Sequence, residues 1–270
     1  MRIIHEYSWH FPPSKNKRGI AYKPHDIKKV IVVESSLFLH PTFLMSDMHG
    51  HTPLVVEMLD SFLHLDQFVV LTAGDMAGKN IYGSDDNPTP SYEFLAQRAR
   101  EFYFVQGNHD LPDPENKHVA LKNKQEKYAA LEHGKVIQTL VGSLGGVHGT
   151  ISSKVHPHKM PHENYMQWAQ KMLVQEVDIF MTHETPSLPV FDQRGNRSIG
   201  NAELFELVDS YKPKIHIYGH CHHADFYTVI NGVHYLNVDA RVVIVLPEED
   251  DAYKKRIYKK KLTDMFNNNF

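Results

Sequence analysis

Cysteine is almost absent from this chain. A single cysteine, Cys221, occurs in 270 residues, so no disulfide can form within the chain. Few cysteines and no disulfide are typical of proteins from reducing compartments. The segment Met1 to His10 has neither the apolar core of a signal peptide nor the length of a membrane span. We therefore expect a soluble, cytoplasmic protein that does not bind a membrane.

A strong net charge is lacking as well. The formal net charge is −3, which provides no global field to recruit nucleic acid or a membrane surface. Hydrophobic residues make up 41% of the chain and charged residues 23%, as in an ordinary globular protein. Internal repeats and low-complexity linkers are missing. We expect a single domain over residues 1–270, with an N-terminal extension over 1–30 and a basic C-terminal tail over 251–270.

Basic residues do gather in these two terminal segments. Lys15, Lys17 and Arg18 lie in the extension, and six lysines and arginines lie between residues 254 and 261. A run of like charges at a terminus is usually a solvated segment. The other interpretation is a contact with nucleic acid or an acidic partner.

The chain is rich in short apolar runs that end in a polar cluster. Five such runs are Phe43–Met45, Phe68–Leu71, Phe102–Val105, Ile179–Met181 and Ile215–Tyr218, and Val30–Val33 is a β-branched run of the same kind. Each predicts a buried strand. Apolar residues at helical spacing predict helices over Val55–Leu63, Tyr165–Leu173 and Leu204–Val208, the last with Asn201 as a plausible N-cap. Strands that alternate with helices indicate an α/β fold.

The polar clusters contain the residue types that bind metals. In chain order they are Asp47-Met48-His49, Gly74-Asp75, Gly107-Asn108-His109-Asp110, His183 and Gly219-His220-Cys221-His222. Groups at the carboxyl ends of strands converge on one rim of an α/β sheet, so we expect the clusters to be neighbours. Imidazole and carboxylate bind Mn, Fe, Co, Ni and Zn, and one aspartate can bridge two ions. Adjacent glycines (Gly50, Gly74, Gly107, Gly219) permit sharp turns and close backbone approach.

Each cluster is a weak signal by itself, whereas their order is specific. With Asp-x-His, Gly-Asp, Gly-Asn-His-Asp, His and Gly-His-x-His in sequence, the chain resembles the calcineurin-like metallophosphoesterase superfamily from about Phe43 to Val243. The resemblance implies two packed, mixed β-sheets flanked by helices, a four-layer αββα sandwich. It also implies a hydrolase of phosphate mono- or diesters that uses two divalent metal ions (Mn, Fe, Zn, Ni or Co).

The resemblance further implies a role for each motif residue. The ligands of the first metal would be Asp47, His49, Asp75 and His222. The ligands of the second would be Asp75, which bridges the two ions, with Asn108, His183 and His220. A metal-bridging hydroxide would attack phosphorus. His109 would protonate the leaving oxygen, and Asp110 would orient His109 and raise its pKa.

The motifs say less about the substrate than about the metal ligands. Protein phosphatases of this superfamily continue Gly-Asp into Asp-Arg-Gly and follow Gly-Asn-His with Glu-Arg, whereas this chain has Met76-Ala77 and Asp110 there. Without those arginines, a phosphodiester or nucleotide is slightly preferred over a phosphoprotein. Candidate substrate contacts are Arg194, Arg197 and His148; a solvated loop or a structural histidine is the other interpretation.

Two other functions remain open from the sequence. The basic terminal segments favour a nuclease acting on DNA or RNA, while the negative net charge does not. The second is an interaction module that binds metal without catalysis. The presence of His109 argues against it, because such a module needs no general acid.

We interpret His51, His156, His158 and His162 as bystanders, the last three in a surface loop that could act as a lid. The side chain of Cys221 is expected to face away from the site.

Overall fold

The computed structural model describes most of the chain. The described residues are 1–10, 27–49, 51–52, 55, 65–77, 86–111, 128–154, 156–189, 199–248, 260–261 and 263–264. Several predicted features therefore lie outside the described residues. These are the predicted helix Val55–Leu63 beyond its first residue, Gly50, Arg194, Arg197, the basic cluster of the N-terminal extension and most of the C-terminal tail.

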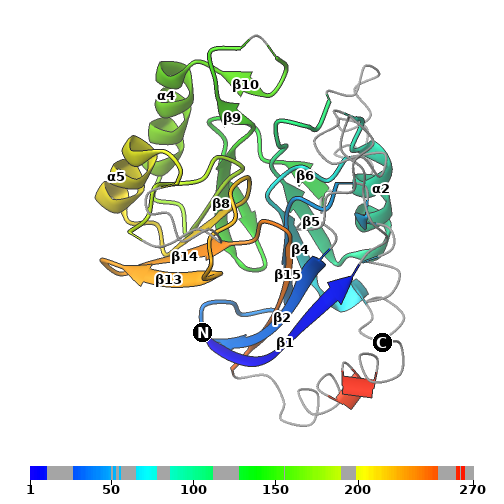
Figure 1. The fold of residues 1–270 in the computed structure, drawn as a ribbon. Coiled ribbons are helices and arrows are strands. Elements are labelled where there is room, and N and C mark those ends of the chain that lie inside the picture. The colour runs from blue at the N-terminus through cyan, green and yellow to red at the C-terminus, as the bar shows by residue number, and fades with distance from the viewer. Residues whose placement is uncertain are drawn as a thin grey trace.

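Two mixed β-sheets form the centre of the molecule (Figure 1). The first sheet contains, in spatial order, β1 (Arg2–His10), β2 (Ile27–Ser35), β15 (Arg241–Pro247), β3 (Thr42–Met45), β4 (Val69–Thr72), β5 (Glu101–Phe104) and β6 (Tyr128–Ala130). The second contains β13 (Tyr227–Ile230), β14 (Val233–Asn237), β12 (Ile215–Tyr218), β11 (Ile179–Thr182), β8 (Gly142–Val147) and β7 (Ile137–Thr139). A small parallel pair joins β9 (Thr150–Ile151) to β10 (Lys159–Met160).

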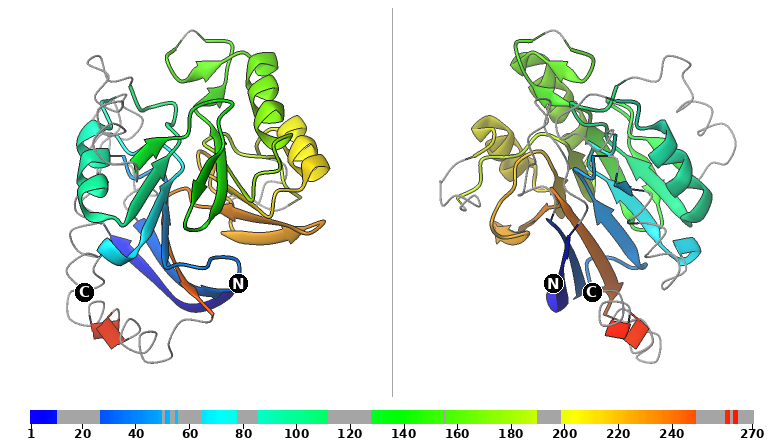
Figure 2. Two further views of the ribbon diagram at one scale, coloured as in Figure 1. Left: turned by 180° about the vertical axis from the view of Figure 1, so that it is seen from behind. Right: turned by 45° about the vertical axis from the view of Figure 1, so that its right-hand side comes forward.

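Helices cover the outer faces of the two sheets. Figure 2 shows α2 (Thr89–Arg98) on one side of the sheets, and α4 (His162–Leu173) and α5 (Ala202–Tyr211) on the other. A short 3₁₀ helix, η2 (Leu65–Gln67), precedes β4. None of the helices that the structure describes has the length and apolar composition needed to span a membrane.

Alternating side chains of the strands build three apolar layers. In β4, Leu71 packs in the core between the sheets, whereas Val70 packs on the outer face with residues of α2. In β11, Met181 belongs to the core between the sheets, and Phe180 packs under α4 and α5. Because neighbouring residues of a strand point to opposite faces, these continuous apolar runs are buried on both sides. The predicted two-sheet fold flanked by helices is confirmed.

The predicted strands and the last two predicted helices are confirmed, with small shifts at their ends. Asn201 caps α5, because its side-chain oxygen accepts a hydrogen bond of 2.7 Å from the backbone N–H of Leu204. His162 is the first residue of α4, so the predicted surface loop ends before it. The N-terminal extension supplies β1, which pairs antiparallel with β2 in the seven-stranded sheet.

His216 is a core histidine that faces the helices from β12. Its Nε2 lies 2.9 Å from the Thr182 hydroxyl, which itself donates to the carbonyl of Glu184, so Nε2 carries the ring proton. The rings of Phe180, Tyr218 and Tyr235 surround it at centroid distances of 5.2–5.8 Å. Burial lowers the pKa of His216 to about 3. The folded protein therefore keeps this imidazole neutral.

We predict that His216 contributes to acid sensitivity. The unfolded chain binds a proton at this position below a pH of about 6.5, whereas the folded chain does not until about pH 3, so stability falls as the pH drops through this window. His216→Phe should unfold like the wild type at about pH 8 and lose about 2 kcal/mol less between pH 7 and 5. Urea unfolding at the two pH values measures this, and equal losses in both proteins would contradict it.

Candidate metal centre

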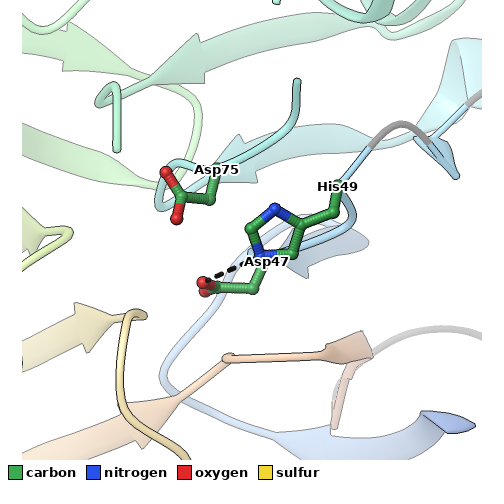
Figure 3. A group of neighbouring side chains, drawn as sticks. All are labelled: Asp47, His49 and Asp75. Carbon is green, nitrogen blue, oxygen red and sulfur yellow. Dashed lines mark ion pairs between the residues drawn. The ribbon is translucent and has the colours of Figure 1, made fainter. Parts of the chain in front are cut away.

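The predicted metal-binding motifs converge where strands of both sheets end. The strands β3, β4 and β5 run parallel in the first sheet, and β11 and β12 run parallel in the second. Asp47, His49 and Asp75 meet there, and their ligand atoms all lie within 4.8 Å of one another. Figure 3 shows the three side chains together, with Nε2 of His49 4.0 Å from Oδ1 of Asp47. All three are buried.

The backbone at these residues is held in the left-handed region. The φ angles are 56° at Asp47, 44° at His49, 51° at Asp75 and 68° at His220. Such a conformation is unfavourable for residues other than glycine, by about 1–3 kcal/mol each, and persists only where the surroundings impose it. Here the loops bind each other: the N–H of Asp47 donates to Gly74 O (2.9 Å) and that of His49 to Asp75 O (3.0 Å).

The second half of the centre lies around Asp75. Nδ1 of His183 donates to the carbonyl of Ala73 at 2.7 Å, and Nε2 faces Oδ2 of Asp75 at 3.4 Å. The ring of His220, which is exposed at the rim, lies 5.1 Å from that of His183. Oδ1 of Asn108 is buried and has no hydrogen-bond partner. A buried oxygen without a donor and an imidazole nitrogen fixed from behind are what a bound cation requires.

Electrostatics also favour a cation here. Burial and the nearby carboxylates of Asp239 and Asp75 hold the pKa of Asp47 well above its usual range. Burial also acts to raise the pKa of Asp75, but the attraction of His183 outweighs it and leaves that pKa below its ordinary value. Burial opposes a charge on His183, yet Asp75 raises its pKa to about 10. A proton and a divalent cation therefore compete for Nε2 of His183.

Two glycines make room for the ligands. A Cβ at Gly107 would lie 2.1 Å from Oδ1 of Asp75, and a Cβ at Gly219 would lie 2.7 Å from Oδ2 of Asp47. Both distances are far inside van der Waals contact, so a larger residue would displace a ligand carboxylate. This confirms the close backbone approach that was predicted beside the ligands.

Asp110 connects two loops of the centre. Its carboxylate accepts hydrogen bonds from the backbone N–H groups of Asp75 (2.8 Å), Gly107 (2.8 Å) and Ala77 (2.9 Å), and from the Tyr92 hydroxyl (3.1 Å). Burial raises its pKa to about 6 despite these donors. The carboxylate thus fastens the Gly-Asp loop to the Gly-Asn-His loop. The predicted orientation of His109 by Asp110 stays a prediction.

His109 and His148 both lie at the rim. His109 is half-buried, its ring is 5.8 Å from that of His49, and its backbone N–H donates to Oδ1 of Asp75 at 2.8 Å. His148 follows β8, the strand beside β11, and its Nδ1 accepts from the N–H of Gln106 at 2.8 Å. The proton of its ring is therefore on Nε2.

His222, another predicted ligand, lies between Asp239 and Arg241. Its Nδ1 lies 2.9 Å from Oδ2 of Asp239, and its Nε2 lies 3.0 Å from Nη2 of Arg241. Sequence analysis missed both partners, which follow the apolar strand β14. That run, Tyr235-Leu236-Asn237-Val238 followed by Asp239, repeats the pattern of an apolar segment that ends in an acid.

Cys221 and two of the histidines interpreted as bystanders have contacts or environments of their own. Nδ1 of His51 faces the carbonyl of Met48 at 3.1 Å, in a buried turn. Burial raises the pKa of Cys221 to about 11, so the thiol stays protonated near neutral pH. His156 and Lys159 form an isolated β-bridge beside the short strand pair.

Comparisons with known proteins agree with this geometry. The family model "Calcineurin-like phosphoesterase" matches residues 40–224. No curated protein matches the chain in sequence. A phosphopantetheinyl hydrolase of Mycobacterium tuberculosis, PptH, has a similar structure (TM-score 0.51, 16% identity), with 81% of this chain and 99% of the hydrolase covered. The protein TT1561 of Thermus thermophilus is similar too (TM-score 0.53, 13% identity), with 73% and 88% covered.

At these identities the solved structures support the fold alone. The family model, in contrast, covers more than half of the chain and includes every metal-binding motif. The chain therefore belongs to the calcineurin-like phosphoesterase family, and it is a metal-dependent phosphoric ester hydrolase.

Proposed function

We propose that the chain hydrolyses phosphate esters at a centre of two divalent cations, with phosphodiesters or nucleotides preferred over phosphoproteins. The observation that carries this proposal is the buried cluster of Asp47, His49 and Asp75. Asp75 faces this cluster and His183 together, which suits a carboxylate that serves two ions. By the family resemblance, His222 completes the first set of ligands, and Asn108, His183 and His220 complete the second.

Bound cations would polarise the phosphoryl group and supply a nucleophile of low pKa. The side chains of the protein prepare for this. The carbonyl of Ala73 holds one proton of His183 on Nδ1, so Nε2 is the nitrogen at which a cation would replace the other proton. The hydroxyl of Ser46 donates to Oδ2 of Asp47 at 2.5 Å, and this hydrogen bond fixes the carboxylate of Asp47. His109, half-buried beside His49, would deliver a proton to the leaving oxygen.

A preference for diesters rests on the scarcity of cationic side chains in the motifs. A phosphate monoester carries one more negative charge than a diester and gains more from arginine contacts. Met76 is fully buried in the core, and Asp110 is committed to backbone groups, so neither position can offer substrate a charge. Manganese is the metal that we would test first, because mixed nitrogen and oxygen ligands accept it.

The first test is the loss of the shared carboxylate. Asp75→Asn keeps the shape of the side chain and removes the negative charge, so we expect kcat/KM for a chromogenic phosphodiester to fall by at least about 100-fold. The substrate panel should include a monoester, a diester and single-stranded DNA, each with Mn, Ni, Zn and Mg. Faster cleavage of DNA than of the chromogenic diester would favour the nuclease. Bound metal without turnover of any ester would indicate an interaction module.

A second test separates His109 from the ligands. His109→Ala should retain the metal content of the wild type and lower kcat by roughly 10²–10⁴-fold for an ester with an alkoxide leaving group. The loss should be much smaller for a nitrophenyl ester, because nitrophenolate departs without a proton. Unchanged kcat for the alkyl ester, or an equal loss with both esters, would contradict the role of His109 as general acid.

A further inference from the structure

The ring of His222 is held at both of its nitrogens by buried neighbours. Nδ1 lies 2.9 Å from the carboxylate and 3.1 Å from the carbonyl oxygen of Asp239, and Nε2 lies 3.0 Å from Nη2 of Arg241. A guanidinium group can only donate, so Nε2 must accept and Nδ1 must carry the proton. The tautomer of His222 is therefore fixed, with its lone pair on Nε2.

Arg241 has other acceptors besides His222. Its Nη2 carries two protons and faces three acceptors: Nε2 of His222 (3.0 Å), the carbonyl of His223 (2.6 Å) and the carbonyl of Ala224 (3.3 Å). If a cation took the lone pair of Nε2 of His222, the two carbonyl acceptors would still satisfy the two protons of Nη2. Arg241 is 1% exposed and is anchored by Asn237 as well.

Asp239 connects this pair to the rest of the centre. It follows β14 and pairs with Ser46 in an isolated parallel bridge, directly beside Asp47. Asp239 is buried, with 6% of its surface exposed. A carboxylate behind a metal-binding imidazole fixes the ring and makes the other nitrogen more basic, and loss of such a partner usually weakens metal binding by about 10–100-fold.

We propose that Asp239 is a positioning residue for the first metal: it keeps the proton of His222 on Nδ1 and reserves Nε2 for the cation. This inference rests on the metal dependence described above and on the ligand role that the family resemblance gives His222. Asp239 acts through His222 and does not touch the substrate.

Titration of the whole chain with Mn²⁺, followed by electron paramagnetic resonance, tests this. Asp239→Asn should bind the first Mn²⁺ about 10-fold more weakly or worse. Asp239→Glu keeps the charge but moves the carboxylate by one methylene, and it should also lose several-fold in affinity. The matched control is Asp225→Asn, which removes the same charge from an exposed residue and should change affinity by less than about twofold.

A double-mutant cycle separates positioning from plain charge. In a His222→Asn background, adding Asp239→Asn should weaken Mn²⁺ binding by less than about twofold, because the group through which Asp239 acts is gone. An equal loss in both backgrounds, or wild-type affinity in both Asp239 variants, would overturn the inference. Thermal unfolding of each variant checks that it is folded. A wild type that binds no Mn²⁺ would instead contradict the proposed function.

Discussion

The structure depends on a concentration of buried carboxylates at one rim of the two sheets. Asp47, Asp75 and Asp239 are 4%, 2% and 6% exposed, and the charges of the other two act to raise the pKa of Asp47. Buried carboxylates are costly unless they are paired or coordinate a metal. Within the described part of the chain, His183 gives Asp75 partial compensation, and Asp239 lies 2.9 Å from Nδ1 of His222. The centre is thus built to be completed by divalent ions.

The fold gathers these charges by bringing strand ends from two sheets to one rim. The apolar layers fix the strands, and the loops that follow are then fastened to one another. Asp110 ties the Gly-Asp loop to the Gly-Asn-His loop through backbone N–H groups. The N–H of His220 donates to Oδ2 of Asp47 at 3.1 Å and so joins the second sheet to the first. These bonds hold the ligands in left-handed conformations that an isolated loop would abandon.

Much of this arrangement could be predicted from the sequence. Apolar runs such as Phe43–Met45 mark strands because both of their faces are buried. The order of the motifs predicts the candidate ligands, of which Asp47, His49 and Asp75 meet in the structure. The fastening of the two loops by Asp110 could not be predicted, because it depends on backbone N–H groups that sequence patterns do not reveal. Asp239 and Arg241 were missed for a related reason. Their partner His222 lies 17 and 19 residues earlier, and only the pairing of β14 with β12 brings them together.

Anomalous X-ray diffraction from crystals grown with Mn²⁺ tests the central claim most directly. The account predicts two strong anomalous peaks that share the carboxylate of Asp75, one beside Asp47 and His49 and the other beside Asn108 and His183. A single peak away from Asp75, or no peak at this rim in crystals saturated with the metal, would contradict it.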